Sequence, residues 1–304
     1  KPIRKTKIEM NIVYFSKGIR GIACLEAVLQ AGYTVVAVIG SGRDDELNTV
    51  CERNNLPLHM PEKPNTLEVA ELLKTFEADI FVCSGYNKIL KPIIFNIPRL
   101  GTINLHGGRL PFYRGAAPTN WQIINGEHEG GCCILFLDEG IDTGPIICQE
   151  SYPIAEDDNH QSILEKVLKI FPRLLVNVLH DFENDNIHSV EQNLDEGCYY
   201  TRRYPEDSRI NWQAMTDVQI HNLVRGMNGP FPHAFTFRGD EKVEIDRTAL
   251  LKEGIKGISG RVPLKRNEGV VVLCQNRGIL VKEISIKGEQ LNPRKFFNIG
   301  EIMT

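Results

Sequence analysis

Three polar side chains, those of Asn104, His106 and Asp142, have the types and spacing that acyl transfer to an amine requires. Asn104 and His106 end an apolar segment that begins at Thr102, and Asp142 follows 36 residues after His106 in a glycine-flanked turn. Side chains two apart on a strand point to the same side, so Asn104 and His106 are predicted to face one site. The amide can donate to an oxyanion, the imidazole can act as acid or base, and the carboxylate can manage the proton of the amine.

Each of these residues also has an ordinary structural explanation. Asn104 alone could cap a loop, and His106 alone could pack in a core. The combination with Leu110-Pro111, Arg114-Gly115 and the later Asp142 favours a shared site. The predicted strand end also supports this interpretation, because open α/β sheets bind ligands beyond the carboxyl ends of their strands.

The composition restricts the class of protein. The chain has 304 residues, of which 42% are hydrophobic and 24% charged, as in ordinary globular proteins of about two domains. Its net charge of −4 disfavours nucleic acid as the main partner, although a local basic patch would be compatible with it. No apolar run approaches the roughly 20 residues of a membrane span, and no secretory signal is recognised. We therefore expect no membrane insertion and a cytoplasmic location.

The eight cysteines predict neither disulfides nor a metal site. Most lie in apolar segments, none forms C-x-x-C, and no His/Cys spacing matches a zinc site. We expect buried free thiols and no bound metal.

The order of segments predicts a parallel α/β sheet that positions the three polar residues. Strands are expected over 10–16, 34–39, 57–60, 79–84 and 102–105, with helices over 18–31, 45–54 and 66–77 between them; Thr66 is expected to cap the last of these helices. This alternation predicts a parallel sheet with helices on both faces. Further along, we expect a helix over 117–125, strands over 131–137 and 145–152, and a long helix over 158–183 that Pro172 kinks or divides.

The C-terminal third has a different pattern. A polar stretch over 201–207 predicts a linker, and one amphipathic helix is expected over 218–227. Short strands follow over 234–237, 242–246, 260–264, 269–273 and 278–286. Their regular spacing is typical of a small β-barrel or sandwich.

The first strand-to-helix turn argues against a nicotinamide dinucleotide. It contains Gly18 and Gly21 but not the G-x-G-x-x-G pattern, and no acidic residue ends the second strand. The two glycines are expected to make a tight turn beneath the helix.

Two segments resemble a known family. They are similar to segments of the formyltransferases that use 10-formyltetrahydrofolate. The first segment contains N-L-H-G, L-P and Y-R-G-A-A-P within 104–118, and the second is L-D-E-G-I-D-T-G-P-I over 137–146. Members formylate glycinamide ribonucleotide, methionyl-tRNA or nucleotide-linked amino sugars. The resemblance runs over nearly the whole chain. It implies a Rossmann-like catalytic domain, here over 9–200, and a smaller C-terminal OB-like β-barrel domain, here over 208–304. It also implies 10-formyltetrahydrofolate as formyl donor and no metal.

The resemblance implies roles for individual residues. Asn104, His106 and Asp142 match the catalytic residues: the first two would stabilise the oxyanion, and Asp142 would accept or relay the amine proton. The expected donor-binding residues, in the two segments that match a pterin pocket, are Tyr86, Lys88, Ile89, Leu90, Leu137, Asp138, Glu139, Gly140 and Ile141. The expected contacts with the acceptor substrate are Gly108, Arg109, Tyr113, Arg114, Asn120 and Trp121.

The chain departs from the family pattern at two places. Gly108-Arg109 replaces the usual Ser-Leu, and the added cation either contacts a substrate phosphate or is simply solvated. His233 stands where the family usually has Gly in the segment 230–235, and we expect a loop or interface residue there.

Three features favour a nucleotide-linked amino sugar as the acceptor. Residues 118–127 resemble the sugar-nucleotide branch, and 202–212 resemble the R-R-x-P-x-D-S…W of the enzyme that formylates UDP-4-amino-4-deoxyarabinose. The overall acidity is the third feature. We therefore expect an N-formyltransferase acting on a UDP-, dTDP- or GDP-linked amino sugar, in lipopolysaccharide or O-antigen synthesis. A homodimer is left open.

The high content of basic residues in the last 70 residues favours an alternative acceptor, methionyl-tRNA. Among these basic residues are Arg238, Lys242, Lys252, Lys256, Arg261, Lys265, Arg266, Arg277, Lys282, Lys287, Arg294 and Lys295. A third interpretation, a catalytically idle fold that serves as a binding domain, is disfavoured by the intact Asn104, His106 and Asp142.

Overall fold

The computed structural model describes residues 10–229 and 232–304. Residue 9, where the catalytic domain was expected to begin, and Pro230-Phe231 of the segment before His233 lie outside the described residues. The chain divides into two compact units, neither of which is one continuous segment. Unit 1 consists of the residues up to Gly115, Gly131–Tyr152 and Glu165–Tyr199; unit 2 consists of Ala116–Gly130, Pro153–Leu164 and Tyr200–Thr304.

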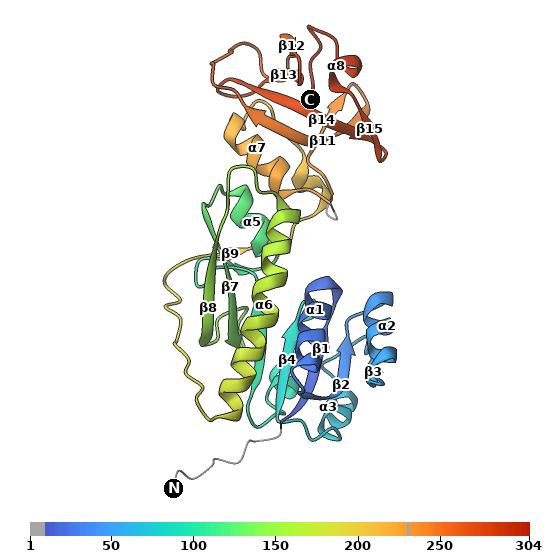
Figure 1. Cartoon of the computed structure of the whole chain (residues 1–304). Coiled ribbons are helices and arrows are strands. Elements are labelled where there is room, and N and C mark those ends of the chain that lie inside the picture. Colours follow the sequence, from blue (N-terminus) through green and yellow to red (C-terminus); the bar gives the residue numbers. More distant parts are fainter. Residues whose placement is uncertain (1–9, 230–231) are drawn as a thin grey trace. The chain divides into compact units, whose positions relative to one another are not determined.

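A seven-stranded sheet forms the centre of unit 1 (Figure 1). Its strands are β1 (Asn11–Ser16), β2 (Thr34–Gly40), β3 (Leu58–His59), β4 (Ile80–Ser84), β5 (Thr102–His106), β7 (Glu129–Phe136) and β8 (Ile146–Pro153). The order is β3-β2-β1-β4-β5-β7-β8, with parallel pairing from β3 to β5 and antiparallel pairing of β5 with β7. The predicted parallel α/β sheet is confirmed.

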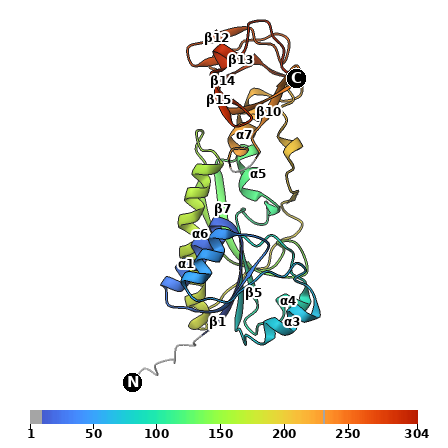
Figure 2. The same ribbon diagram turned by 90° about the vertical axis from the view of Figure 1, so that its right-hand side faces the viewer.

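Helices cover both faces of this sheet, which explains why β1 and β4 are apolar almost throughout. They are α1 (Gly18–Gln30), α2 (Asp45–Arg53), α3 (Leu67–Lys74), α4 (Pro92–Phe95) and α6 (His160–Glu183). Figure 2 shows α1 and α6 on one side of the strands and α3 and α4 on the other. As the sequence predicts, Thr66 caps α3: its hydroxyl oxygen accepts a hydrogen bond from Val69 N at 3.3 Å. The long α6 contains Pro172 but is one helix.

Unit 2 is built on an antiparallel sheet of six strands (Figure 1). They are β10 (Phe235–Arg238), β11 (Glu241–Leu250), β12 (Leu264–Arg266), β13 (Gly269–Leu273), β14 (Gly278–Ile286) and β15 (Glu289–Leu291); the unit also contains α5 (Pro118–Ile124), η1 (Pro205–Ser208), α7 (Asp217–Gly226) and α8 (Pro293–Phe296). The order is β10-β11-β14-β13-β12, and β15 pairs with β14. The expected antiparallel C-terminal β domain is confirmed. Two further short strands, β6 (Arg114–Gly115) and β9 (Tyr199–Tyr200), form a separate sheet.

The C-terminal residues close this sheet into a barrel. Thr304 N donates to Phe237 O at 3.0 Å and Phe237 N to Thr304 O at 2.9 Å. Val262 N donates to Glu301 O and Gly300 N to Val262 O, each at 2.9 Å. The strand expected over 260–264 is therefore wrong in its position. Pro263 has no N–H to continue a ladder, so β12 begins after it, and the residues before it bond to the C-terminal segment.

The cysteine prediction is right for six of the eight residues. Cys24, Cys51, Cys83, Cys132, Cys133 and Cys274 are buried free thiols, whereas Cys148 is half-buried and Cys198 is exposed. Burial raises the pKa of Cys24 to about 12, which keeps its thiol protonated and unreactive. Among the residues that the structure describes, no helix is long and apolar enough to cross a membrane.

A buried carboxylate joins α7 to the barrel. Asp217 is 1% exposed and accepts hydrogen bonds from Asn276 Nδ2 at 2.8 Å and Arg277 Nε at 2.6 Å. Asp217 N donates to Asn276 Oδ1 at 3.0 Å. Burial raises the pKa of the Asp217 carboxyl, but the hydrogen bonds from Asn276 and Arg277 outweigh burial and lower the pKa overall.

Removal of this carboxylate is expected to destabilise unit 2. Asp217→Ala leaves Arg277 without its partner, and we expect a loss of about 3 kcal/mol in urea unfolding at pH 7. The carboxylate is stabilising above its unfolded pKa of about 3.9, so the difference from wild type should be constant from pH 7 to 5 and shrink below about pH 4. Asp240→Ala, at an exposed turn, is the control. A difference that does not change with acid would contradict this account.

Candidate active site

Strand β5 places Asn104 and His106 at its carboxyl end. The strand lies between β4 and the antiparallel β7, with His106 opposite Cys133. Asn104 is half-buried and His106 is 5% exposed, while Leu105 points to the other side of the sheet. The strand is one residue longer than the sequence predicts, so His106 belongs to it.

The turn between β7 and β8 carries Asp142. Asp138 Oδ1 accepts hydrogen bonds from Gly140 N at 3.0 Å and from Thr143 Oγ1 at 2.6 Å, which tightens the turn. A Cβ atom on Gly144 would lie 2.0 Å from Phe136 O, so this position requires glycine. Asp142 itself has a φ of +54°, in the left-handed region that residues with a side chain rarely adopt.

The three side chains meet at this turn. Asn104 Nδ2 lies 3.4 Å from Asp142 Oδ1, and His106 Nδ1 lies 3.4 Å from Asp142 Oδ2. Gly115 N donates a shorter hydrogen bond of 2.9 Å to Asp142 Oδ2. The Asp142 carboxylate is therefore shared by an amide, an imidazole and a main-chain N–H. The long first two distances indicate contacts that can be exchanged for contacts with a ligand.

The second nitrogen of His106 is already engaged. His106 Nε2 lies 2.6 Å from Tyr113 O, and because a carbonyl only accepts, Nε2 carries a proton. His106 Nδ1 is therefore the nitrogen that faces Asp142. The imidazole links the loop that contains Tyr113 to the Asp142 turn, and the amide of Asn104 is the less committed donor.

Among the residues expected to bind a formyl donor, two isoleucines are exposed and one tyrosine has a buried hydroxyl. Ile89 and Ile141 are 69% and 51% exposed. Tyr86 packs edge-on against Phe15 with ring centroids 5.3 Å apart, and its hydroxyl is buried without a hydrogen-bond partner among the described residues. Burial raises the pKa of Tyr86, so the hydroxyl stays protonated and can donate.

Other residues of this group have structural contacts. Lys88 Nζ donates to Pro61 O and Glu62 O, each at 2.8 Å, and thereby fixes its loop. Leu90 is buried and Leu137 packs against the same core cluster. Glu139 and Gly140 are exposed, and Asp138 orders its own turn.

Three of the residues expected to contact the acceptor lie close to His106. Gly108 is buried and its carbonyl accepts a hydrogen bond from Cys133 Sγ at 3.3 Å. Arg109 packs across Gly131, where a Cβ atom would lie 3.1 Å from Arg109 Cβ. Tyr113 is buried and holds His106 through its carbonyl. Glycine at 131 therefore leaves room for the main chain and the first side-chain atoms of residue 109.

Arg114 has a more interior position than the sequence predicts. It is 2% exposed, its Nη2 donates to Leu194 O at 3.3 Å and Glu196 O at 3.0 Å, and its Cζ lies 4.4 Å from the centre of the Tyr199 ring. Its Nε and Nη1 have no partner among the described residues. These contacts tie the segment 194–199 to β6, so Arg114 organises the site rather than offering an open surface for phosphate.

The last two expected acceptor contacts, Asn120 and Trp121, lie in unit 2. Asn120 is buried, and its Nδ2 donates to Gly226 O at 2.7 Å, which joins α5 to α7. Trp121 Nε1 donates to Thr201 O at 3.0 Å, and Arg203 Cζ lies 4.6 Å from the Trp121 ring centre. The amide nitrogen of Asn120 is therefore committed to packing.

The structure also reveals contacts that no sequence motif indicates. Gln192 Nε2 donates to Asp142 O at 2.9 Å. Asn65 Nδ2 donates to Ile89 O at 2.9 Å, and Lys91 N donates to Asn65 Oδ1 at 2.7 Å. Gln192 and Asn65 are single polar residues in irregular segments, and they are distant in the sequence from the motifs that they contact. Within 10–229 and 232–304, no cluster of His, Cys, Asp and Glu could hold a metal ion.

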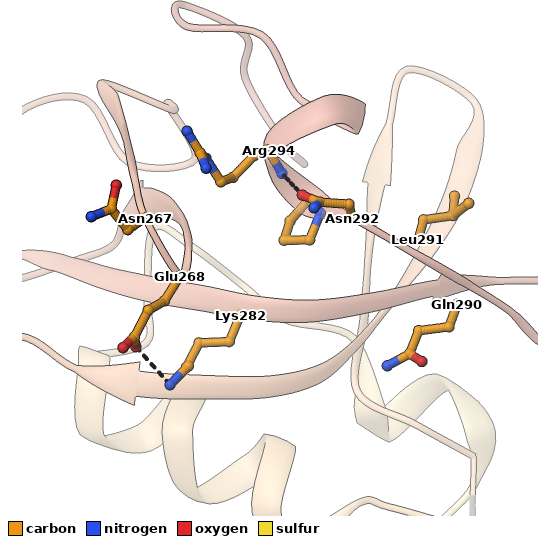
Figure 3. A pocket seen from close by; sticks show the side chains of 8 residues that line it. Asn267, Glu268, Lys282, Gln290, Leu291, Asn292 and Arg294 are labelled. Carbon is orange, nitrogen blue, oxygen red and sulfur yellow. Dashed lines mark hydrogen bonds and ion pairs between the residues drawn. The ribbon is translucent and has the colours of Figure 1, made fainter.

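A hollow of about 320 Å³ in the barrel is lined by none of the predicted site residues (Figure 3). Its lining residues are Asn267, Glu268, Lys282, Gln290, Leu291, Asn292, Pro293 and Arg294. Lys282 Nζ pairs with Glu268 Oε2 at 2.7 Å, and Asn292 Oδ1 accepts from Arg294 N at 2.9 Å. These contacts engage three of its six polar side chains, and the combination of amide, imidazole and carboxylate found at Asp142 does not occur in its lining.

Comparison with known proteins agrees with this architecture. Residues 12–179 match the family Formyl transferase, and residues 203–300 match Formyl transferase, C-terminal domain. The methionyl-tRNA formyltransferase of Geotalea uraniireducens is 32% identical over 293 residues, which are 92% of each chain.

Solved structures show the same fold. The N-formyltransferase from Helicobacter canadensis, determined with folinic acid and dTDP-3-aminofucose, has a TM-score of 0.69 at 22% identity, covering 90% of this chain and 99% of that one. A sugar N-formyltransferase from a Shewanella species has a TM-score of 0.66 at 22% identity, covering 81% and 100%. With two matching domains in order and a relative of this identity over nearly its whole length, the chain belongs to the formyl transferase family.

Proposed function

We propose that this protein transfers a formyl group from 10-formyltetrahydrofolate to the amino group of a nucleotide-linked amino sugar. The observation that carries the proposal is the meeting of Asn104, His106 and Asp142 at the carboxyl end of β5. The activity requires no metal in this proposal. The cytoplasm, where folates and nucleotide sugars are made, is the proposed location.

The proposed chemistry assigns one task to each side chain. Asn104 Nδ2 has a second N–H with no acceptor among the described residues, and it donates to the formyl oxygen as negative charge develops there. Asp142 accepts, through a water, the proton that the amine loses on attack, and this proton passes to N10 of tetrahydrofolate as the bond between the formyl carbon and N10 breaks. His106 Nδ1 faces this carboxyl group and can accept a hydrogen bond from it once Asp142 has taken up the proton, while Tyr113 O orients the ring.

The two loops beside the site fit the proposed donor, which supplies an activated formyl group when bound. Ile89 and Ile141 present exposed apolar side chains that suit the faces of a pterin ring. Tyr86 contributes a buried hydroxyl without a partner among the described residues. Lys88 and Asn65 fix the loop that carries Ile89 through hydrogen bonds to main-chain carbonyls, and they need not touch the donor.

The charges of the barrel support a small acceptor. Of the thirteen basic residues in the last 70, six form ion pairs. These pairs are Arg238–Glu301, Lys242–Glu244, Arg247–Glu283, Arg266–Glu253, Arg277–Asp217 and Lys282–Glu268. Arg261 and Lys265 donate to main-chain carbonyls instead. Much of the base that could bind phosphates is therefore neutralised or engaged locally, which weakens the case for a polyanion.

Methionyl-tRNA is the second candidate acceptor, and a specific observation favours it. Relatives that match over nearly the whole chain, at 32% identity in Geotalea uraniireducens and 30% in Clostridioides difficile, are methionyl-tRNA formyltransferases. The structural neighbours named as sugar formyltransferases are less similar in sequence. The proposal for the sugar rests on the 118–127 and 202–212 patterns and on the paired charges of the barrel.

Loss of the proposed catalytic groups should abolish turnover without unfolding the protein. Asp142→Asn removes the proton acceptor, and Asn104→Ala removes an oxyanion donor; we expect each to lower kcat about 100- to 1,000-fold. Formyl transfer is measured by release of tetrahydrofolate, and folding by circular dichroism. His106→Ala should lose turnover in the same way, and His180→Ala, at an exposed position of α6, is its control. Near-native turnover of a folded Asp142→Asn protein would refute the assignment of Asp142 as the proton acceptor.

An acceptor panel separates the two candidates. UDP-, dTDP- and GDP-linked 3- and 4-amino sugars are compared with methionyl-tRNA at 50 and 200 mM salt. We expect turnover of one sugar that changes little with salt, because few phosphates are bound. A tRNA acceptor contacting six to ten phosphates would instead lose affinity by about 10³- to 10⁵-fold over this range. Turnover of tRNA alone would replace the sugar proposal.

The exposed isoleucines should control donor affinity. Ile141→Asp places a charge against the apolar face of the pterin, and we expect at least a tenfold weaker binding of tetrahydrofolate, equivalent to about 1.4 kcal/mol. Stability should hardly change, because Ile141 is exposed. Ile258→Asp, at an exposed isoleucine of the barrel, is the matched control. Equal affinities for both variants and wild type, by calorimetric titration, would remove Ile141 from the donor site.

A further inference from the structure

The main chain of the Asp142 turn is held by one distant side chain. Gln192 Nε2 donates to Asp142 O at 2.9 Å and to Gly144 O at 2.7 Å. An amide nitrogen has two N–H bonds, so Gln192 serves both carbonyls at once. An amide oxygen in this place would face two acceptors, and the contacts therefore fix which end of Gln192 is nitrogen.

The other end of the same amide has no partner. Gln192 Oε1 is buried and accepts no hydrogen bond from the described residues. A buried acceptor without a donor is unfavourable. The arrangement is understandable because the nitrogen end meets two carbonyls of a turn whose central residue, Asp142, has the unfavourable φ of +54°.

Gln192 is held in place on both sides. Two residues before it, Val190 pairs with Ile146, each N–H donating to the other carbonyl at 2.9 Å. Two residues after it, Leu194 O accepts a hydrogen bond from Arg114 Nη2 at 3.3 Å. Gln192 therefore projects from a segment that is fixed to β8 and to β6.

These contacts form a closed circuit around Asp142. Arg114 is followed by Gly115, whose N–H donates to the Asp142 carboxylate at 2.9 Å. The carboxylate is thus held by the chain at 114–115, and the carbonyl of the same residue is held by Gln192. Arg114 connects the segment at 114–115 to the segment that carries Gln192, through its hydrogen bond to Leu194 O. A turn freed from Gln192 could relax Asp142 out of the left-handed region and move its carboxylate away from Gly115 and His106.

We propose that Gln192 is a positioning residue for formyl transfer, which acts by holding the Asp142 turn in the conformation that keeps the carboxylate between Gly115 N and His106. This inference rests on the proposed function of Asp142. Gln192 need not touch either substrate, so its contribution belongs to kcat rather than to the binding of donor or acceptor.

The test removes the two N–H donors while keeping the volume of the side chain. Gln192→Met is expected to lower kcat about 10- to 100-fold, as small displacements of a reacting group do, with KM for 10-formyltetrahydrofolate and for the best acceptor of the panel within twofold. Gln192→Glu should be impaired at least as much, because a carboxylate would face two carbonyls. Asn193→Ala is the matched control, since Asn193 contacts only its own segment, at Asp195 and Glu196.

A double-mutant comparison shows whether Gln192 acts through Asp142. In the Asp142→Asn background, Gln192→Met should change the residual rate less than twofold, because the group it positions is already lost. Hydrogen–deuterium exchange of the free protein should be faster over 137–145 in Gln192→Met, with the barrel unchanged.

The outcomes are distinguishable. Native kcat in Gln192→Met, with Asp142→Asn inactive, would overturn the positioning role and leave the proposed function standing. An equal loss in both backgrounds, or an increased KM with native kcat, would also overturn it. Near-native activity of Asp142→Asn would refute the proposed function itself.

Discussion

Asp142 stands in a left-handed backbone conformation, and the polar contacts of the site are arranged around it. Aspartate adopts this conformation more readily than most residues with a side chain, but the right-handed region is still preferred, so contacts from neighbouring groups help to hold it. Gly144 and the Asp138 cap shape the turn, while Gly115 N and Gln192 hold the two ends of the residue. The sheet supplies what these local contacts need: β5 and β7 are adjacent, so the turn after β7 returns beside the end of β5.

The sequence predicts what depends on local patterns. The apolar strands, the Thr66 cap and the separation of Asn104 from His106 by two residues are features of short segments, and the structure brings Asn104, His106 and Asp142 together. Features that depend on distant approaches were not predictable. Gln192 contacts the turn 50 residues before it, and Asn120, which was expected to contact the acceptor, is buried because α7 packs against it.

The acceptor is a harder problem for the same reason. Base-rich composition is a property of the sequence, but its meaning depends on which carboxylates the fold places nearby. In the barrel, Arg277 meets Asp217 across 60 residues and Arg238 meets Glu301 across 63. The thirteen basic residues among the last 70 therefore give a weaker positive field than their number indicates.

The closing of the barrel by residues 300–304 has a consequence for synthesis. Phe237 on β10 and Val262 find their main-chain partners only in these residues. Until these residues have paired, the sheet has two unpaired edges, which are templates for pairing with other nascent chains. Deletion of residues 300–304 would remove very little apolar mass from unit 2. It would nevertheless leave an open sheet, and the cell would encounter the lesion as aggregation during translation rather than as a defect in catalysis.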